Sequence, residues 1–298
     1  MAISAFLTYL SLEKKYSPLT VMAYRGDLEE YARFCQEEYQ INDIEKVEYG
    51  IIRSWIVHLS NTRLSNRSIN RKISSLKTYY KFLVGIGEIE VSPLARHRSL
   101  KTPKKIEIPF SEIEMEKVFL QIPFENNFEG IRDRSIIELL YTSGIRRSEL
   151  INLRLKQIDL SAKTIKVLGK RNKERILPLL ESTAAFFAIY IQERNSLENI
   201  VDNDYVFLLK SGNKIYETLV YRIINKYFSL VSPKVKKSPH ILRHTFATHM
   251  LNKGADLNSV KELLGHSSLA STQVYTHTGI AELKKVHGAY HPRSKEGE

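Results

Sequence analysis

A single cysteine, Cys35, is present among the 298 residues of the chain. One thiol cannot form an internal disulfide or a cysteine-built zinc site. The chain also lacks any run of 18 or more apolar residues, and its first residues, MAISAFLTYLSLEKKY, contain neither the basic segment nor the cleavage site of a secretory signal. We therefore expect a cytoplasmic protein without a membrane-spanning segment.

Acidic residues are fewer than basic ones. The chain has 33 Asp and Glu against 45 Lys and Arg, which gives a formal net charge of +12. Residues 1–105 contain 17 basic and 11 acidic residues, and residues 106–298 contain 28 and 22, so each part has a charge of +6. This distribution favours nucleic acid as the partner over an acidic membrane surface, because no amphipathic helix with a concentrated basic face stands out.

Periodic apolar residues predict helices throughout the first hundred residues, over about 3–15, 18–38, 49–60 and 65–87. The last helix has a core-facing stripe formed by Ile69, Ile73, Leu76, Tyr80 and Leu83. Its other face carries basic and hydroxyl side chains, either as a solvated surface or for contact with DNA. These residues are Arg67, Arg71, Lys72, Ser75, Lys77 and Lys81.

The composition changes between Ser92 and Pro109, where SPLARHRSLKTPKKIEIP combines three prolines with basic residues and weak periodicity. Such a segment is typical of an exposed linker between domains. We therefore expect a helical domain over residues 1–98, a linker over 99–109 and a second domain over 110–298.

The second domain is predicted to be mostly helical, with a small antiparallel β-sheet. Helices are expected over about 111–120 and 131–143, and again near Arg146, Ser182, Glu217 and Ser238. Between them, TIKVLG and ERILPL are β-branched runs joined by KRNK, which predicts a hairpin with Lys170 at its tip. The fold class that follows is mainly α, in two domains. The segment after His287 is expected to be loosely ordered.

The stretch from Ser238 to His277 concentrates polar residues suited to chemistry. Ser238-Pro239 begins a helix in which His240 and Arg243 are three residues apart, while Leu242, Phe246 and Met250 form the core face. A short second helix is expected from about Asp256 to Gly265. His266 follows that helix directly, and Tyr275 follows nine residues later on a further short segment.

Three upstream residues complete the set: Arg146 and Glu149 in TSGIRRSEL, and Lys170 in GKRNKERILPL. Two arginines can clamp the non-bridging oxygens of a phosphodiester at any working pH. A tyrosine can form a covalent phosphoester, and a lysine can protonate the leaving oxygen. The sequence therefore predicts phosphodiester transesterification without a metal or another cofactor.

The motifs TSGIRRSEL, GKRNKERILPL, HILRHTFATH and LGHSSLASTQVYTH resemble, in order and spacing, those of the tyrosine recombinases or phage integrases. The resemblance is closest to the bacterial Xer-type site-specific recombinases and covers essentially the whole chain. Individual motifs such as LGH are weak indicators, whereas the four together are specific. Ile145 departs from the family's usual leucine, and Arg147 adds a charge that could touch DNA.

The resemblance implies a role for each matching residue. It makes Arg146 and Arg243 the phosphate clamp, Lys170 the general acid, His240 the base-like histidine, His266 a hydrogen-bond donor to the scissile phosphate and Tyr275 the nucleophile. It also makes Glu149 a residue that orients a member of the site. Lys173 and Arg175 are expected to contact DNA, whereas His244, His249 and His277 have no catalytic role in the family pattern.

The resemblance further implies an architecture and partners. A SAM-like helical DNA-binding domain and the catalytic domain would close on the duplex as a C-shaped clamp. Cleavage would proceed through a 3′-phosphotyrosine and a Holliday junction, in a homo- or hetero-tetramer that could include a second recombinase subunit. A cell-division or DNA-translocase regulator is a further possible partner. The short apolar stripe formed by Ile280, Leu283 and Val286 could pack on its own catalytic domain, but the resemblance implies that it docks on a neighbouring protomer, which is what we expect.

Four functions remain open within this reading. The first is resolution of chromosome or plasmid dimers, and the second is integration of a mobile element; the absence of an added arm-binding domain favours the first. A type IB-like topoisomerase and a non-catalytic DNA-binding protein are less favoured, the latter because the set of six catalytic residues is intact. The sequence does not indicate the target DNA site.

Overall fold

The structure is a computed structural model that describes residues 2–103, 107–169, 174–234, 236–265 and 277–295. The chain divides into two compact units, Met1–Lys105 and Ile106–Glu298. Most of the described residues in both units are helical, and the only strands among them form one small sheet in the second unit. No helix in the described ranges is both long and apolar enough to cross a bilayer.

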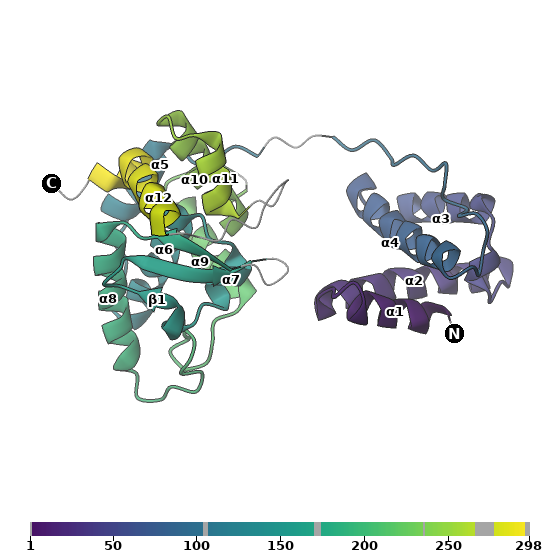
Figure 1. Ribbon diagram of the computed structural model, residues 1–298, viewed down its shortest axis with the longest axis horizontal. Coiled ribbons are helices and arrows are strands. Elements are labelled where there is room, and N and C mark those ends of the chain that lie inside the picture. Colours follow the sequence, from purple (N-terminus) through teal and green to yellow (C-terminus); the bar gives the residue numbers. More distant parts are fainter. Residues whose placement is uncertain (1, 104–106, 170–173, 235, 266–276, 296–298) are drawn as a thin grey trace. The chain divides into compact units, whose positions relative to one another are not determined.

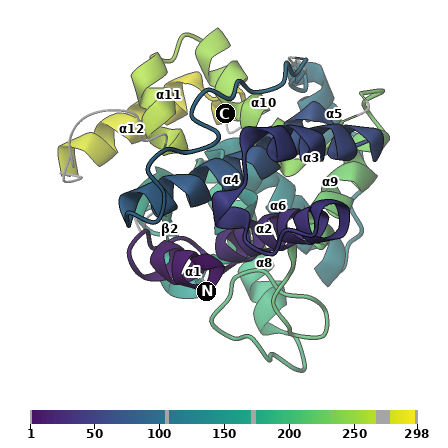
Figure 2. The same cartoon turned by 90° about the vertical axis from the view of Figure 1, so that its right-hand side faces the viewer.

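The first unit is a helical bundle (Figures 1 and 2). Its elements are α1 (Ala2–Leu12), α2 (Pro18–Tyr39), the 3-10 helix η1 (Ile44–Lys46), α3 (Tyr49–Asn61) and α4 (Asn66–Gly85). Ser17 and Ser65 cap α2 and α4, because each hydroxyl accepts a hydrogen bond from a backbone N–H in the first turn. The predicted stripe of α4 is buried against the other helices, and the only tryptophan, Trp55, lies in the same core.

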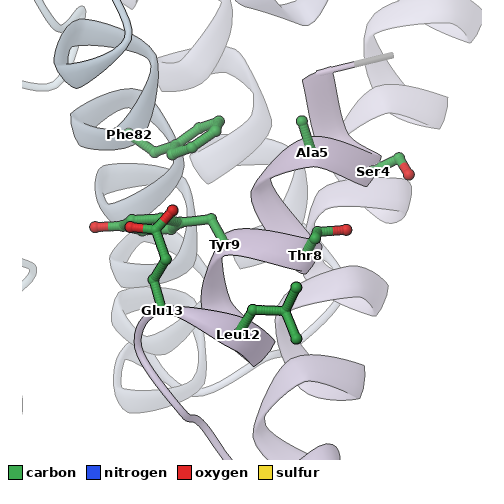
Figure 3. A pocket seen from close by; sticks show the side chains of 7 residues that line it. All are labelled: Ser4, Ala5, Thr8, Tyr9, Leu12, Glu13 and Phe82. Carbon is green, nitrogen blue, oxygen red and sulfur yellow. The ribbon is translucent and has the colours of Figure 1, made fainter.

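Helix α1 packs on α4 through aromatic rings. Phe82 lies 5.4 Å from Phe6 and 4.9 Å from Tyr9, measured between ring centroids. The side of α1 beside these rings leaves an open groove (Figure 3). The groove is lined by Ser4, Ala5, Thr8, Tyr9, Leu12, Glu13 and Phe82.

The segment that we expected to be an exposed linker is partly packed on the first unit. Leu94 is only 2% exposed, and Leu100 packs against the same core. Two hydrogen bonds join Asn70 of α4 to Leu100. The side-chain Nδ2 of Asn70 donates to the Leu100 carbonyl, and the Leu100 N–H donates to the side-chain Oδ1 of Asn70. The prediction of an exposed linker was based on the basic, proline-rich composition and overlooked the apolar residues Leu94 and Leu100 within it.

The second unit is built around α6, which is buried along most of its length (Figure 1). Helices α8, α9 and α10 contact it, and α12 lies beside α11 and strand β3. The elements are α5 (Glu112–Leu120), α6 (Phe128–Ser143), α7 (Arg147–Ile151), η2 (Leu155–Gln157), β1 (Ile158–Asp159), β2 (Thr164–Leu168), β3 (Glu174–Pro178), α8 (Glu181–Asn195), α9 (Glu217–Ser229), α10 (Pro239–Asn252), α11 (Leu257–Leu264), α12 (His277–Tyr290) and η4 (Pro292–Lys295).

The sheet has the order β1-β2-β3 and is antiparallel throughout. Strands β2 and β3 form the predicted hairpin, with Lys166 opposite Ile176 and Leu168 opposite Glu174. The two-residue strand β1 was not predicted, because it is too short to show a periodic pattern. The expected mainly α fold with a small antiparallel sheet is confirmed.

Candidate active site

The turn between α6 and α7 places the first arginine. Gly144 ends α6 in the left-handed conformation, with φ of 60°. A Cβ on Gly144 would lie 2.5 Å from a ring carbon of Phe246, so both the backbone and the packing require glycine here. Arg146 then caps α7, and Glu149 in the first turn accepts hydrogen bonds from the Arg146 N–H at 2.9 Å and from its Nη1 at 2.7 Å.

The second arginine comes from α10, which begins at Pro239 with Ser238 as its cap. Arg243 is 8% exposed. Its Nη1 donates to the Gly144 carbonyl and its Nη2 to the Leu264 carbonyl, each at 2.5 Å. Burial, and then the positive charges of Arg146 and Arg175, lower the pKa of Arg243 to about 10, so its side chain remains charged at neutral pH.

Three arginines meet at the C-terminal end of α11. Arg175 Nε donates to the Leu263 carbonyl at 3.1 Å, Arg243 to the Leu264 carbonyl, and Arg146 Nη2 to the Gly265 carbonyl at 3.0 Å. The last carbonyls of a helix lack partners within the helix and lie at the negative end of its dipole, so cations are favourable there. Arg146, Arg175, Arg243 and Glu149 are called the arginine cluster below.

Arg175 has a different role from the one we expected. We expected it to contact DNA, but it is 4% exposed and forms two hydrogen bonds of 2.8 Å to the two carboxylate oxygens of Glu149. In β3, Arg175 is in phase with the buried Leu177. Successive side chains of a strand point to opposite faces, so the position of Arg175 two residues from Leu177 indicated a buried side chain. This indication was overlooked because arginine is normally exposed.

The arginine cluster has more positive than negative charge. Its three guanidinium groups surround one carboxylate, which leaves a formal excess of two positive charges. Burial alone would raise the pKa of Glu149. Hydrogen bonds and charge from Arg175, and hydrogen bonds from Arg146, together have the larger effect and lower this pKa below its usual value, so the carboxylate is ionised. The Arg146 side chain is 25% exposed, against 4% for that of Arg175. The cluster can therefore bind an anion on the Arg146 side.

His240 lies in a different environment from Arg243, although both are on α10. Its side chain is 73% exposed, and its Nε2 lies 3.3 Å from a carboxylate oxygen of Glu107. Lys236 also binds Glu107, mainly by a hydrogen bond, and this contact lowers the pKa of the Glu107 carboxyl. Glu107 had no signal in the sequence, because it precedes α10 by more than 130 residues.

Three residues of the expected site lie outside the described residues: Lys170, His266 and Tyr275. Their neighbours in the chain are described. Lys170 belongs to the connection between Leu168, where β2 ends, and Glu174, where β3 begins. His266 directly follows Gly265, and Tyr275 precedes α12 by two positions.

In the structure of the single chain, helix α12 packs on its own unit. Docking of its apolar side on a neighbouring protomer stays a prediction. Leu283 is 5% exposed within the core of the second unit, and Val286 and Tyr290 pack against that core. His287 and His291 are each 2% exposed, so the segment up to Ser294 is ordered and not loose as expected. The spacing of the residues already indicated that this helix continues in the core, because His287 is four residues from Leu283 and so lies on the same helical face.

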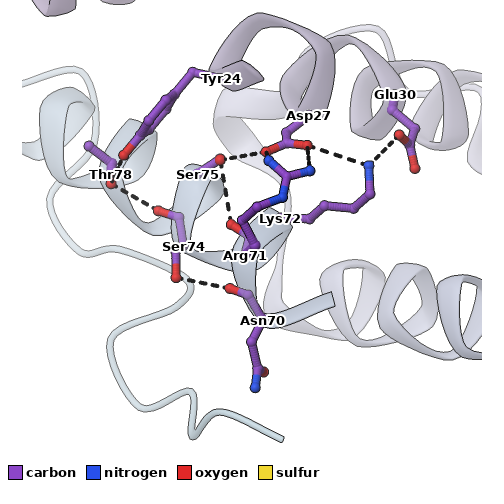
Figure 4. Close-up of polar contacts among 9 residues, drawn as sticks. All are labelled: Tyr24, Asp27, Glu30, Asn70, Arg71, Lys72, Ser74, Ser75 and Thr78. Atoms are coloured by element: carbon purple, nitrogen blue, oxygen red, sulfur yellow. Dashed lines mark hydrogen bonds and ion pairs between the residues drawn. The ribbon is translucent and has the colours of Figure 1, made fainter. Parts of the chain in front are cut away.

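In the first unit, part of the basic face of α4 is occupied by internal contacts (Figure 4). Asp27 of α2 accepts two hydrogen bonds from Arg71, at 2.7 and 2.8 Å, and one of 2.7 Å from Ser75. Lys72 is 9% exposed and lies between Asp27, at 3.4 Å, and Glu30, at 2.5 Å. Lys72 and Ser75 therefore join α2 to α4, whereas the sequence had placed them on a face that is either solvated or in contact with DNA. Asp27, Glu30, Arg71 and Lys72 are called the α2–α4 cluster below.

Comparison with known proteins identifies relatives of both units. The Phage integrase family matches residues 114–281, and the family described as Phage integrase, N-terminal SAM-like domain matches residues 3–86. The chain is 40% identical over 295 residues to a protein named Tyrosine recombinase XerC from Oceanobacillus iheyensis, covering 98% of this chain and 96% of that one. A protein of the same name from Chlorobaculum parvum is 38% identical over 315 residues and covers 97% and 94%.

Solved structures with the same fold include a recombinase and an integrase, each bound to DNA. The XerH site-specific recombinase on a palindromic difH substrate, after cleavage, has a TM-score of 0.69 at 19% identity and covers 95% of this chain and 93% of its own. The Tn1549 transposon integrase with a circular-intermediate DNA has a TM-score of 0.68 at 20% identity, with coverage of 94% and 98%. At these identities the likeness concerns the fold.

Proposed function

Because this chain belongs to the phage integrase family of tyrosine recombinases, we propose that it cuts and rejoins double-stranded DNA at a specific site through a covalent bond to Tyr275. The observation that carries the proposal is the charge excess of the arginine cluster. Arg146 and Arg243 approach each other from two helices and are held by backbone carbonyls at the end of α11. Two fixed guanidinium groups suit the non-bridging oxygens of a phosphodiester.

The transition state of the cleavage step gains negative charge on those oxygens. Donors that are already oriented stabilise this charge without reorganising, and removal of one such donor typically costs about 10²–10³-fold in rate. Arg175 and Glu149 supply the orientation, since Glu149 binds both Arg175 and Arg146. We assign Arg146 and Arg243 to phosphate binding, and Glu149 and Arg175 to holding them.

The remaining roles follow from the chemistry of transesterification. The phenolic oxygen of Tyr275 attacks phosphorus, and the 5′ oxygen of the next nucleotide leaves. Lys170 protonates the leaving oxygen, and His240 takes the phenolic proton. His266, directly after Gly265, donates a hydrogen bond to the phosphate. The bond from phosphorus to the tyrosine preserves the energy of the phosphodiester, so rejoining needs no nucleotide cofactor.

We further propose an Xer-type role in resolving chromosome or plasmid dimers, supported by the XerC relatives at 36–40% identity. Strand exchange through a Holliday junction requires four protomers, either of this chain alone or with a second recombinase. A cell-division protein or DNA translocase that controls the reaction fits the same role. Integration of a mobile element is the alternative, and the Tn1549 integrase shows that the fold also serves that function.

The test is to trap the covalent intermediate. A duplex that carries a nick near the cleavage point loses a short fragment after cleavage, so the protein–DNA adduct accumulates and is seen on a denaturing gel. Tyr275→Phe should bind DNA normally and form no adduct. Tyr221→Phe, which alters a 43%-exposed tyrosine of α9, is the matched control and should form the adduct at the normal rate. An adduct that persists in Tyr275→Phe would assign the nucleophile to another of the 16 tyrosines.

A further inference from the structure

The last turn of α6 is completed by the C-terminal segment of the chain. A helix leaves its final four carbonyls without partners inside the helix. In α6, the Thr142 carbonyl accepts a hydrogen bond of 2.6 Å from His287 Nε2, and the Tyr141 carbonyl lies 3.4 Å from His291 Nε2. Because a carbonyl only accepts, the proton of the His287 ring is on Nε2. Both histidines are 2% exposed, so these contacts are shielded from water.

The same turn leads directly to the arginine cluster. Gly144 is two residues after Thr142, and its carbonyl accepts the 2.5 Å hydrogen bond from Arg243. Arg146 follows two residues later and caps α7. A displacement of the chain at Thr142 would therefore move an anchor of Arg243 and the backbone of Arg146 together. A misplacement of about 1 Å can cost a reaction about 10²-fold.

Two kinds of contact hold α12 in place, and they differ in what they determine. Leu283, Val286 and Tyr290 supply apolar burial, which is non-directional and favours any position that removes the side chains from water. The hydrogen bond from His287 to Thr142 is directional and fixes both partners. Apolar burial can seat α12, whereas the hydrogen bond from His287 fixes its distance from the Thr142 carbonyl, next to the α6–α7 turn.

We propose that His287 is a positioning residue for the cleavage reaction: by holding the Thr142 carbonyl, it sets the α6–α7 turn so that Arg146 and Arg243 face the scissile phosphate when α12 is seated. This inference rests on the proposed phosphate-binding role of the two arginines. Helix α12 begins two residues after Tyr275. One helix is thereby tied in sequence to the nucleophile and in space to the phosphate clamp.

The variants that test the proposal are His287→Gln and His287→Met in the full chain. The two side chains have similar length and volume, but only glutamine has an N–H that can donate to the Thr142 carbonyl. On a nicked phosphodiester duplex at saturating protein, we expect His287→Gln to cleave within about threefold of the unaltered chain. We expect His287→Met to be slower by about 10–10²-fold. Leu283→Ala is the packing control, because it removes buried apolar surface from α12 while the hydrogen bond from His287 to Thr142 stays in place.

A second substrate separates positioning of the arginines from general damage. A methylphosphonate at the scissile position replaces one charged non-bridging oxygen by a methyl group, so the clamp has less charge to neutralise. For each protein, we compare the rate on this neutral linkage with the rate on the phosphodiester. The ratio does not depend on how much of the protein is folded. It should rise in His287→Met, as in Arg146→Ala, and stay unchanged in His287→Gln and Leu283→Ala.

The outcomes are distinguishable. If Arg146→Ala raises the ratio while His287→Met does not, the arginines bind the phosphate but His287 does not position them. Equal phosphodiester rates for His287→Gln and His287→Met would also overturn the inference. If Arg146→Ala itself leaves the ratio unchanged, the phosphate-binding role fails, and the proposed function with it.

Discussion

The two units each contain a buried carboxylate with cations around it, but the balance of charge differs. In the α2–α4 cluster, Asp27 and Glu30 face Arg71 and Lys72, so two negative charges meet two positive ones. In the arginine cluster, Glu149 alone faces Arg146, Arg175 and Arg243. A balanced set is complete without a ligand and joins two helices. A set with surplus positive charge can be completed by an anion, which we propose is the scissile phosphate.

The strongest test of this comparison removes the carboxylate from each cluster. Glu149→Gln leaves the 4%-exposed side chain of Arg175 without its counter-ion, and loss of one partner of a buried pair typically costs about 3–5 kcal/mol. It also frees Arg146, so cleavage should fall by about 10²-fold or more. Both effects are read from thermal unfolding and from adduct formation on a nicked duplex.

Asp27→Asn is the matched change in the first unit. It should lower stability less, because the Arg71 side chain is 54% exposed and can turn to solvent. Adduct formation at saturating protein should remain within about threefold of normal, since the proposed catalytic residues belong to the other unit. If Asp27→Asn and Glu149→Gln slow cleavage equally, the distinction between a balanced and a surplus cluster is wrong.

Lys170→Ala tests the proton transfer to the leaving oxygen, which the surplus charge of the arginine cluster does not supply. In the proposed reaction the arginines stabilise charge on the phosphate, but the leaving 5′ oxygen also needs a proton, and general acid catalysis typically contributes about 10²–10⁴-fold. The variant should be strongly defective on a normal phosphodiester and nearly normal on a substrate with sulfur at the 5′ bridging position, because a thiolate leaves without a proton. Equal defects on both substrates would mean that Lys170 only positions the DNA.

The second unit should be more sensitive to acid than the first, where burial and Lys77 lower the pKa of one histidine, His97. Burial lowers the pKa of His287 to about 4 and also lowers the pKa values of His249 and His291. The unfolded chain takes up these protons near pH 6.5, so the second unit loses stability as the pH falls from about 6.5 towards 4. The loss from His287 is on the order of 3 kcal/mol.

Trp55 makes this difference measurable, because the only tryptophan reports on the first unit alone. Between pH 6.5 and 4.5, unfolding followed by far-ultraviolet circular dichroism should develop an early phase that tryptophan fluorescence does not show. His287→Gln should reduce the shift of that phase with pH. Coincident transitions by both probes across the whole range would contradict separate histidine control of the second unit.

The smallest effects are expected at exposed pairs. Arg147 binds Glu217 with side chains that are 38% and 56% exposed, and such pairs contribute at most about 1 kcal/mol. Arg147→Ala should leave stability and cleavage nearly unchanged. If Arg147 contacts DNA, the slope of log affinity against log salt should fall by about one. Loss of cleavage in this variant would place Arg147 inside the arginine cluster.

The sequence predicted elements with strong local signals. Ser17, Ser65 and Ser238 mark helix starts, Gly144 and Gly265 mark ends, and the β-branched runs around residues 164–179 mark the hairpin. The motifs also identified Arg146, Arg243 and Glu149 together. Each of these features is determined by the residue type and by residues close to it in the sequence.

The remaining features depend on contacts between distant segments. Arg175 reaches Leu263 across 88 residues, and His287 reaches Thr142 across 145. An arginine or a histidine is normally exposed to solvent, and whether it is buried instead depends on the packing of distant segments around it. The same reason explains why Lys72 and Ser75 were expected to be surface residues, since Asp27 is far away in the sequence.

The most direct test of the central claim is the effect of Arg243→Ala on two substrates that differ only in charge. The cleavage rate is measured on a nicked duplex with a phosphodiester and on the same duplex with a methylphosphonate at the scissile position. If the surplus charge of the arginine cluster binds the phosphate, Arg243→Ala should lose about 10²–10³-fold on the phosphodiester and less than about tenfold on the neutral linkage. An equal loss on both substrates would contradict the account, because Arg243 would then act only through the structure of the protein.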